Sequence, residues 1–193
     1  MRVGYIEGLK RLYDPDTGER KVLFLASSDG KDKANVMPFS SWAISLVDPQ
    51  GWCIAVYVFT GHFTHELIDK TKQFTVNAPR NAMDEIIECC GSMSGRNHDK
   101  FKECGLTAVA SCYVAPPIIK EYIVHFECEV YNSYPFTMTF PGMDRDPREM
   151  TVFEGRILAA HADEDNRAQD SGAATNESQW SGQLRQLNSE TEV

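Results

Sequence analysis

A proline and two serines interrupt an otherwise strand-like region near the start of the chain. The segment Ala34–Trp42 (ANVMPFSSW) lies between the apolar runs Val22–Ser28 and Trp52–Phe59. Pro38 has no backbone N–H to donate to a sheet, and it favours extended geometry at Met37. We therefore predict a strand that is interrupted here or lies at a sheet edge. Its small hydroxyl groups and freed N–H groups are then predicted to form the floor of a cofactor site.

Length and charge exclude several classes of protein. The chain has 193 residues, enough for one domain with a substantial core, and a net charge of −9. A nucleic-acid partner is not expected, because phosphate binding needs clustered Lys and Arg. No apolar run is long enough for a transmembrane helix, and the N-terminal residues do not resemble a signal peptide, so no membrane partner is expected. Residues 162–193 contain seven acidic and two basic side chains and carry much of the net charge.

The cysteine pattern predicts reduced thiols and no metal site. The cysteines form no CxxC pair, and no histidine stands at zinc-finger spacing from them. The adjacent pair Cys89-Cys90 is a possible redox pair, but neighbours in sequence rarely form an unstrained disulfide. Buried, reduced thiols are typical of cytoplasmic proteins, and a cytoplasmic location is expected. The six cysteines are Cys53, Cys89, Cys90, Cys104, Cys112 and Cys128.

Hydrophobic periodicity predicts short strands joined by brief helices. Strands are expected at 22–28, 34–46 (interrupted), 52–59, 73–78, 122–131 and 150–161, and helices at 62–71, 81–90 and 99–105. Six or seven short strands without a repeat favour a mainly β fold, a β-barrel, over a βαβ sheet. We expect a lead-in loop or hairpin at 1–20, a barrel domain at 21–161 and a disordered acidic tail at 162–193.

A set of short motifs occurs in a characteristic order between about residues 20 and 163. The motifs are Asn35–Ser40, Thr64 with Glu66–Ile68, Phe74–Pro79, Ser94-Gly95 before Asp99–Phe101, Gly105–Thr107, Phe126–Val130 and Gly155–Leu158. In order and spacing they resemble the flavin reductase-like family, the FMN-binding split barrels that include flavoredoxins. The resemblance implies a split β-barrel with FMN as its cofactor. It also implies a homodimer, because these barrels usually complete their flavin sites at a subunit interface.

The resemblance also implies a set of cofactor-binding residues. Ser40, Ser41 and the backbone of Phe39 would line the flavin ring, while Trp42 either flanks the ring or belongs to the core. Lys100 would place a cation near the polar edge of the ring or the phosphate. The full set of candidates is Met37, Pro38, Phe39, Ser40, Ser41, Trp42, Thr60, His62, Thr64, His65 and Lys100.

Thr64 is expected to begin a helix and to bind phosphate there, since a helix N-terminus attracts anions. His62 and His65 flank it and would add positive charge that depends on pH. Many family members have Arg near the position of His62, so phosphate binding is expected to be weaker or pH-dependent in this chain. His125, a lone histidine in an apolar strand, is expected to be a satisfied core residue.

The leading interpretation is therefore an FMN-dependent oxidoreductase, either a flavin reductase or a flavoredoxin-like electron-transfer protein. NAD(P)H or a redox protein would be the electron donor. Without a Gly-x-Gly-x-x-Gly motif, NAD(P)H would bind transiently over the flavin, and no acid–base residue is assigned. One alternative is a flavin- or haem-binding barrel without turnover, acting as a carrier or sensor. Another is a damaged or truncated family member, because residues 163–193 do not resemble the usual C-terminal segment.

Overall fold

A computed structural model describes residues 5–14, 18, 21–48, 51–80, 84–139 and 146–162. Its helices are α1 (Tyr5–Lys10), α2 (Phe63–Thr71), α3 (Asp84–Ser92) and α4 (Lys100–Glu103). Its strands are β1 (Leu23–Ser28), β2 (Ala34–Phe39), β3 (Trp42–Asp48), β4 (Gly51–Phe59), β5 (Gln73–Ala78), β6 (Ala108–Val109), β7 (Ile118–Ile119), β8 (Val124–Met138) and β9 (Arg148–Ala162). The tail predicted beyond residue 162 lies outside the described residues.

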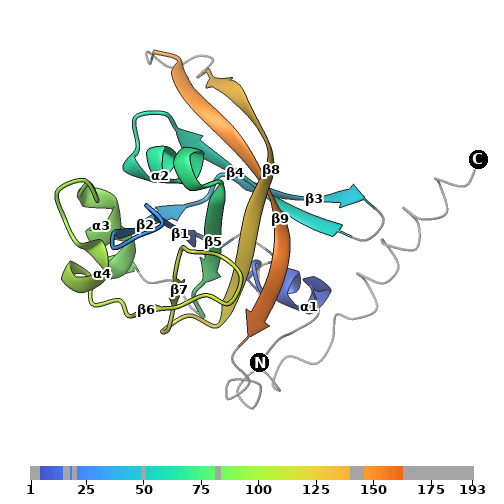
Figure 1. Ribbon diagram of the computed structural model, residues 1–193, viewed down its shortest axis with the longest axis horizontal. Coiled ribbons are helices and arrows are strands. Elements are labelled where there is room, and N and C mark those ends of the chain that lie inside the picture. Colours follow the sequence, from blue (N-terminus) through green and yellow to red (C-terminus); the bar gives the residue numbers. More distant parts are fainter. Residues whose placement is uncertain are drawn as a thin grey trace, which may run out of the picture. The chain divides into compact units, whose positions relative to one another are not determined.

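Seven strands form one antiparallel sheet in the order β2-β1-β5-β8-β9-β4-β3 (Figure 1). β2 and β3 are consecutive in the chain, yet they stand at opposite ends of this order. The break between them falls at Ser40-Ser41, as the sequence predicts. Pro38 is tolerated because β2 is an edge strand that pairs with β1 alone in the sheet. The N–H that Pro38 lacks is therefore not needed for pairing with a second strand. The chain therefore passes from one edge strand of the sheet to the other at Ser40-Ser41.

The interior contains two apolar clusters. The larger one fills the space enclosed by the sheet and includes Phe74, Phe126 and Phe153. The smaller one packs β1 and β2 against α3 and α4, and it includes Phe24 and Tyr122 in edge-to-face contact. Because the two clusters lie on either side of β1 and β2, these strands are held from both faces. Figure 1 shows α3 and α4 beside β2, and α2 beside β4.

Three sequence predictions differ from the structure at the ends of elements. The lead-in residues Tyr5–Lys10 form helix α1, not a loop or hairpin. The helix predicted at 81–90 continues past Gly91 and ends at Ser92. β8 continues to Met138, past the predicted end at residue 131, because its outer half pairs with the start of β9. In each case tertiary packing or strand pairing overrides the local pattern.

One face of β5 and β8 is polar although it is buried. Thr75, Asn77, His125 and Glu127 are all buried there, and cross-strand pairing places them side by side. His125 Nδ1 is 2.9 Å from Asn77 Oδ1, so His125 is a satisfied interior residue, as predicted.

These polar side chains form hydrogen bonds with the backbone of residues 107–123, a segment that contains β6 and β7. Thr75 Oγ1 donates to the carbonyl of Pro117 over 2.6 Å, and Asn77 Oδ1 accepts from the N–H of Ile119 over 3.1 Å. The Glu127 carboxylate accepts two further backbone N–H groups of the same segment. Buried polar groups are stable only when paired, so this segment and the sheet beneath it form one unit.

We predict that Gly155→Ala destabilises the protein by about 2–3 kcal/mol. A Cβ at Gly155 would overlap the ring of Phe74 and approach Cys128 to 3.0 Å, and both neighbours are fully buried. Urea unfolding measures the loss. Gly61→Ala is the matched control, because no heavy atom lies within 4 Å of its added Cβ, and it should change stability by less than about 0.5 kcal/mol. Equal stability of the two variants would contradict the packing described here.

Candidate functional site

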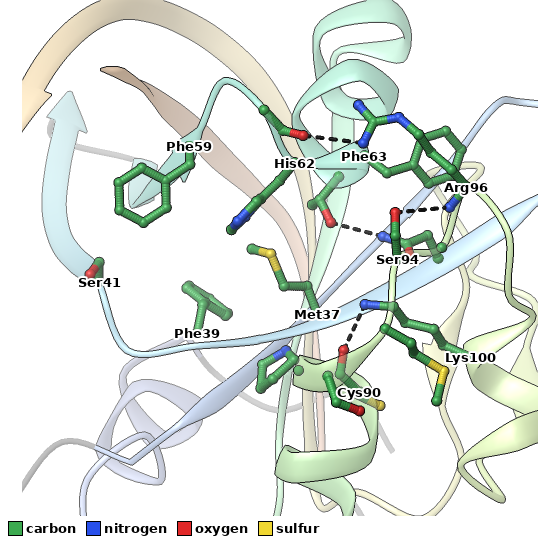
Figure 2. A pocket seen from close by; sticks show the side chains of 18 of the residues that line it. Met37, Phe39, Ser41, Phe59, His62, Phe63, Cys90, Ser94, Arg96 and Lys100 are labelled. Carbon is green, nitrogen blue, oxygen red and sulfur yellow. Dashed lines mark hydrogen bonds between the residues drawn. The ribbon is translucent and has the colours of Figure 1, made fainter. Parts of the chain in front are cut away.

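A cavity of about 580 Å³ lies where the break between β2 and β3 meets the start of α2 and the segment from α3 to α4. This volume is within the usual range for small-molecule sites. Figure 2 shows side chains from these separate segments converging on it. Eight of the predicted site residues line the cavity: Met37, Pro38, Phe39, Ser40, Ser41, His62, Thr64 and Lys100.

Three predicted site residues do not line the cavity. Trp42 is 2% exposed, donates from Nε1 to the carbonyl of Lys21 and packs edge-to-face on Tyr13, so it belongs to the core. Thr60 donates to the carbonyl of Glu149. His65 contacts Thr151 through Nε2, at 2.8 Å. Thr60 and His65 precede and follow cavity residues in sequence, but their side chains are directed to β9.

Asn35 joins two of the converging segments. Its Nδ2 donates to Thr64 Oγ1 over 2.8 Å, and both side chains are buried. Gly95 packs directly against this pair, because a Cβ there would overlap the Asn35 amide and crowd the Phe63 ring. In the sequence, Asn35 stands in the motif Asn35–Ser40 but is not among the predicted site residues. Its role in the site depends on a partner 29 residues away, which no local pattern reveals.

The helix cap predicted at Thr64 is wrong. α2 begins after His62, whose backbone is extended and whose side chain makes no capping hydrogen bond. The Thr64 hydroxyl is instead the acceptor for Asn35. Thr64 therefore fixes β2 to α2 at the edge of the cavity and does not cap the helix.

Lys100 is a buried cation in the wall of the cavity. It is 5% exposed, and its Nζ donates to the carbonyl of Cys90 over 2.6 Å (Figure 2). Asp99 caps the start of α4 by accepting from the N–H of Lys102, which fixes Lys100 at the first position of the helix. Burial lowers the pKa of Lys100, so an anionic ligand beside Nζ would compensate for the lost hydration of its charged form.

Two buried polar atoms of the cavity lack a hydrogen-bond partner among the described residues. They are Asn35 Oδ1 and His62 Nδ1. Leaving such an atom unpaired costs about 1–3 kcal/mol, which a polar ligand would remove. Burial, followed by the nearby charges of Arg148, Lys100 and Arg96, lowers the pKa of His62 below its ordinary value of 6.5. His62 is therefore a neutral hydrogen-bonding group at pH 7, and it gains charge only on acidification.

Basic and aromatic side chains form the rim of the cavity: Phe59, Phe63 and Arg96 line it, and Arg148 adjoins it by packing on Phe59. Arg96 pairs with Glu66 and donates to the carbonyl of Gly61, and its guanidinium lies over the ring of Phe63. Arg148 stacks on Phe59 with 3.7 Å between its Cζ and the ring centroid. The sequence does not single out these groups, because arginine is usually a surface residue and phenylalanine usually a core residue. Glu66 offsets the charge of Arg96, and Arg148 adds positive charge to the rim in a chain whose net charge is −9.

A disulfide links the two helices that flank the segment 93–99. Cys89 and Cys104 are joined, which connects α3 to the residue that follows α4. The prediction of reduced thiols is wrong for these two residues. The sequence offers no cue, because the partner of Cys89 is not its neighbour but lies 15 residues away. Cytoplasmic location stays a prediction, and it no longer has these two thiols as support.

We predict that reduction of this disulfide lowers the free energy of unfolding by about 3 kcal/mol, the value expected for a loop of this length. Urea unfolding with and without reductant measures the change. The double variant Cys89→Ser/Cys104→Ser should show the lower stability in both conditions. Cys112→Ser, which removes an exposed free thiol, should respond to reductant as the wild type does. A wild type insensitive to reductant would refute the bond.

The chain is similar to known proteins in sequence and in fold. The family model for the flavin reductase like domain matches residues 19–176. An uncharacterised protein of Pyrococcus abyssi is 30% identical over 154 residues, which are 80% of this chain and 77% of the relative. The flavoredoxin of Methanosarcina acetivorans is 29% identical, with a TM-score of 0.57 over 74% of this chain and 68% of that one.

A further match concerns the fold alone. The FMN-binding domain of a flavin reductases-like enzyme from Shewanella baltica is 17% identical, with a TM-score of 0.61 over 84% of this chain and 76% of that one. The mainly β architecture and these neighbours confirm the predicted split-barrel fold. Because the family model spans more than half of the sequence, the chain belongs to the flavin reductase-like family.

Proposed function

We propose that the cavity binds FMN and that the protein is an FMN-dependent oxidoreductase of the flavin reductase or flavoredoxin type. Membership of the family and likeness to a flavoredoxin support a flavin-binding, redox-type protein. The observation that supports FMN as the ligand is Lys100, a buried cation in a cavity of suitable volume. A buried cation is costly without an anionic partner, and FMN carries both a phosphate and an electron-rich ring edge.

The other cavity residues fit the same ligand. A flavin ring has both hydrogen-bond donors and acceptors at its polar edge, which suits the unpaired Asn35 Oδ1 and His62 Nδ1. Met37, Phe39 and Phe59 supply apolar surface for a flat aromatic system. The basic rim at Arg96 and Arg148 adds positive potential for a phosphate.

Bound FMN would supply the redox chemistry, accepting hydride or electrons from NAD(P)H or a redox protein and passing them to an acceptor. The chain's own residues would bind the cofactor, orient it and exclude water from it. The floor formed by Pro38, Phe39, Ser40 and Ser41 contains no group that titrates near neutral pH. Such a surface suits hydride transfer, in which positioning matters more than acid–base catalysis.

The absorption spectrum of the protein after reconstitution with FMN, followed by anaerobic addition of NADH or NADPH, tests the proposed activity. We expect loss of the flavin absorption with at least one of these donors or with a low-potential redox protein. If the protein binds flavin but none of these donors reduces it, the proposed activity is contradicted and a carrier or sensor without turnover is favoured. A Soret band in the isolated protein would favour the haem-binding alternative, for which the unpartnered His62 nitrogen is the candidate ligand.

We predict that Lys100→Met weakens FMN binding at least tenfold, since hydrogen bonds to charged groups contribute about 1.5–3 kcal/mol. Titration of flavin fluorescence measures the dissociation constant. Lys102→Met is the matched control, because Lys102 lies on the same short helix with its side chain exposed. Equal affinities of the two variants would contradict a cofactor contact by Lys100.

We also propose a homodimer whose interface includes the outer half of β8. Tyr131, Tyr134 and Phe136 are each at least 40% exposed there, which is unusual for large aromatic side chains. Phe136 packs edge-to-face on Tyr57, which lines the cavity. An exposed aromatic strip that reaches the cavity suits a partner subunit that completes the site.

Substitution of this strip tests the dimer. We expect Tyr134→Asp and Phe136→Asp each to raise the dimer dissociation constant at least tenfold, because an interface core excludes unpaired charge. Sedimentation equilibrium measures the constant. Tyr113→Asp, at an exposed aromatic residue of the segment 107–123, is the control and should leave the constant unchanged. A wild type that stays monomeric at all concentrations tested would refute the proposed dimer.

A further inference from the structure

We propose that Cys112, Glu127 and His161 form a binding site for a divalent transition-metal ion, with Zn²⁺ as the preferred ion. None of the three lines the cavity described above. One ligand atom from each side chain lies within 4.8 Å of the other two. Among the described residues this is the one cluster of at least three His, Cys, Asp or Glu side chains close enough to share an ion.

The three side chains come from three parts of the fold. Cys112 belongs to the segment 107–123, Glu127 to β8 and His161 to β9. Pairing of β8 with β9 sets His161 opposite His125 and diagonal to Glu127 on the same face of the sheet. The distance between His161 Nε2 and Glu127 Oε1 is 2.7 Å. The spacing along the sequence resembles no zinc motif, which explains why the sequence analysis predicts no metal site.

The carboxylate is oriented before any ion binds. Glu127 is fully buried, and its Oε1 accepts from the N–H of Cys112 over 3.0 Å. Its Oε2 accepts from the N–H of Tyr113 over 2.6 Å. Backbone donors of this kind fix a metal-binding carboxylate, and the first of them also fixes the backbone of Cys112 beside it.

The donor set matches Zn²⁺. A thiolate, a carboxylate and a neutral imidazole are its three usual kinds of protein ligand. In a tetrahedral site with bonds of about 2.0–2.3 Å, the ligand atoms stand about 3.3–3.7 Å apart. The observed cluster reaches this spacing when the exposed Cys112 side chain moves inward by about 1 Å and the ion replaces the hydrogen bond between His161 and Glu127.

Charge and access also suit a divalent ion. With the thiol deprotonated, the site carries two negative charges, and binding releases the thiol proton to solvent. Cys112 is exposed and the side chain of His161 is 21% exposed, so an ion can enter and a water molecule can fill the fourth position. A bound ion would link the segment 107–123 to β8 and β9 through Cys112, Glu127 and His161.

Calorimetric titration of the full chain with Zn²⁺, without reductant, tests the site. We expect one ion per chain, with affinity reduced at least tenfold by Cys112→Ser and by His161→Gln. His98→Gln is the matched control, because His98 also lies beside a carboxylate, 3.0 Å from Glu103, but in no three-ligand cluster among the described residues. The control should bind Zn²⁺ as the wild type does.

Co²⁺ provides a readout that does not depend on variants. The difference spectrum of the Co²⁺-loaded wild type should show a thiolate-to-metal charge-transfer band and the intense visible bands of tetrahedral Co²⁺. No saturable binding, binding unchanged by Cys112→Ser, or a Co²⁺ spectrum without the thiolate band would each overturn the proposal. Binding that is lost in Cys89→Ser/Cys104→Ser but kept in Cys112→Ser would assign the ion to the other cysteines and would overturn it as well.

Discussion

The buried hydrogen bond from Asn35 to Thr64 is the contact on which the site depends. It ties the edge strand β2 to the start of α2, and Gly95 packs against it from the segment between α3 and α4. Three segments far apart in sequence therefore meet at one point. Asn35 Oδ1 stays buried against Gly95 and has no hydrogen-bond partner among the described residues, so the residue that assembles the site also keeps an acceptor unused at the cavity wall.

Much of the fold follows from local sequence. Pro38 and the two serines after β2 predict the break in the sheet, because a missing N–H and short polar side chains disfavour a central strand. The strands β1, β4 and β5 follow from their apolar pattern. Helix α1 and the outer half of β8 do not follow, because their stability comes from the tertiary partners they contact. The order of the strands in the sheet is likewise a property of the whole chain.

The site was predicted in part, and mainly through family resemblance. Residues beside the sheet break and Lys100 line the cavity, as predicted. They belong to the motifs Asn35–Ser40 and Asp99–Phe101, on which the family resemblance rests. Trp42 and His65 were included for their chemistry, yet the alternation of a strand and the turn of a helix direct their side chains elsewhere. The Cys89–Cys104 disulfide and the cluster at Glu127 join distant residues, which spacing along one sequence does not reveal.

The central claim is that the cavity binds a flavin and that its cations recognise the phosphate. Calorimetric titration of the flavin-free protein with FMN and with riboflavin tests it most directly. We predict saturable binding of one FMN per chain and at least tenfold weaker binding of riboflavin, because riboflavin lacks the phosphate that the cationic wall and rim would attract. Equal affinities would contradict the role of the cations, and no saturable binding of either ligand would contradict the flavin site itself.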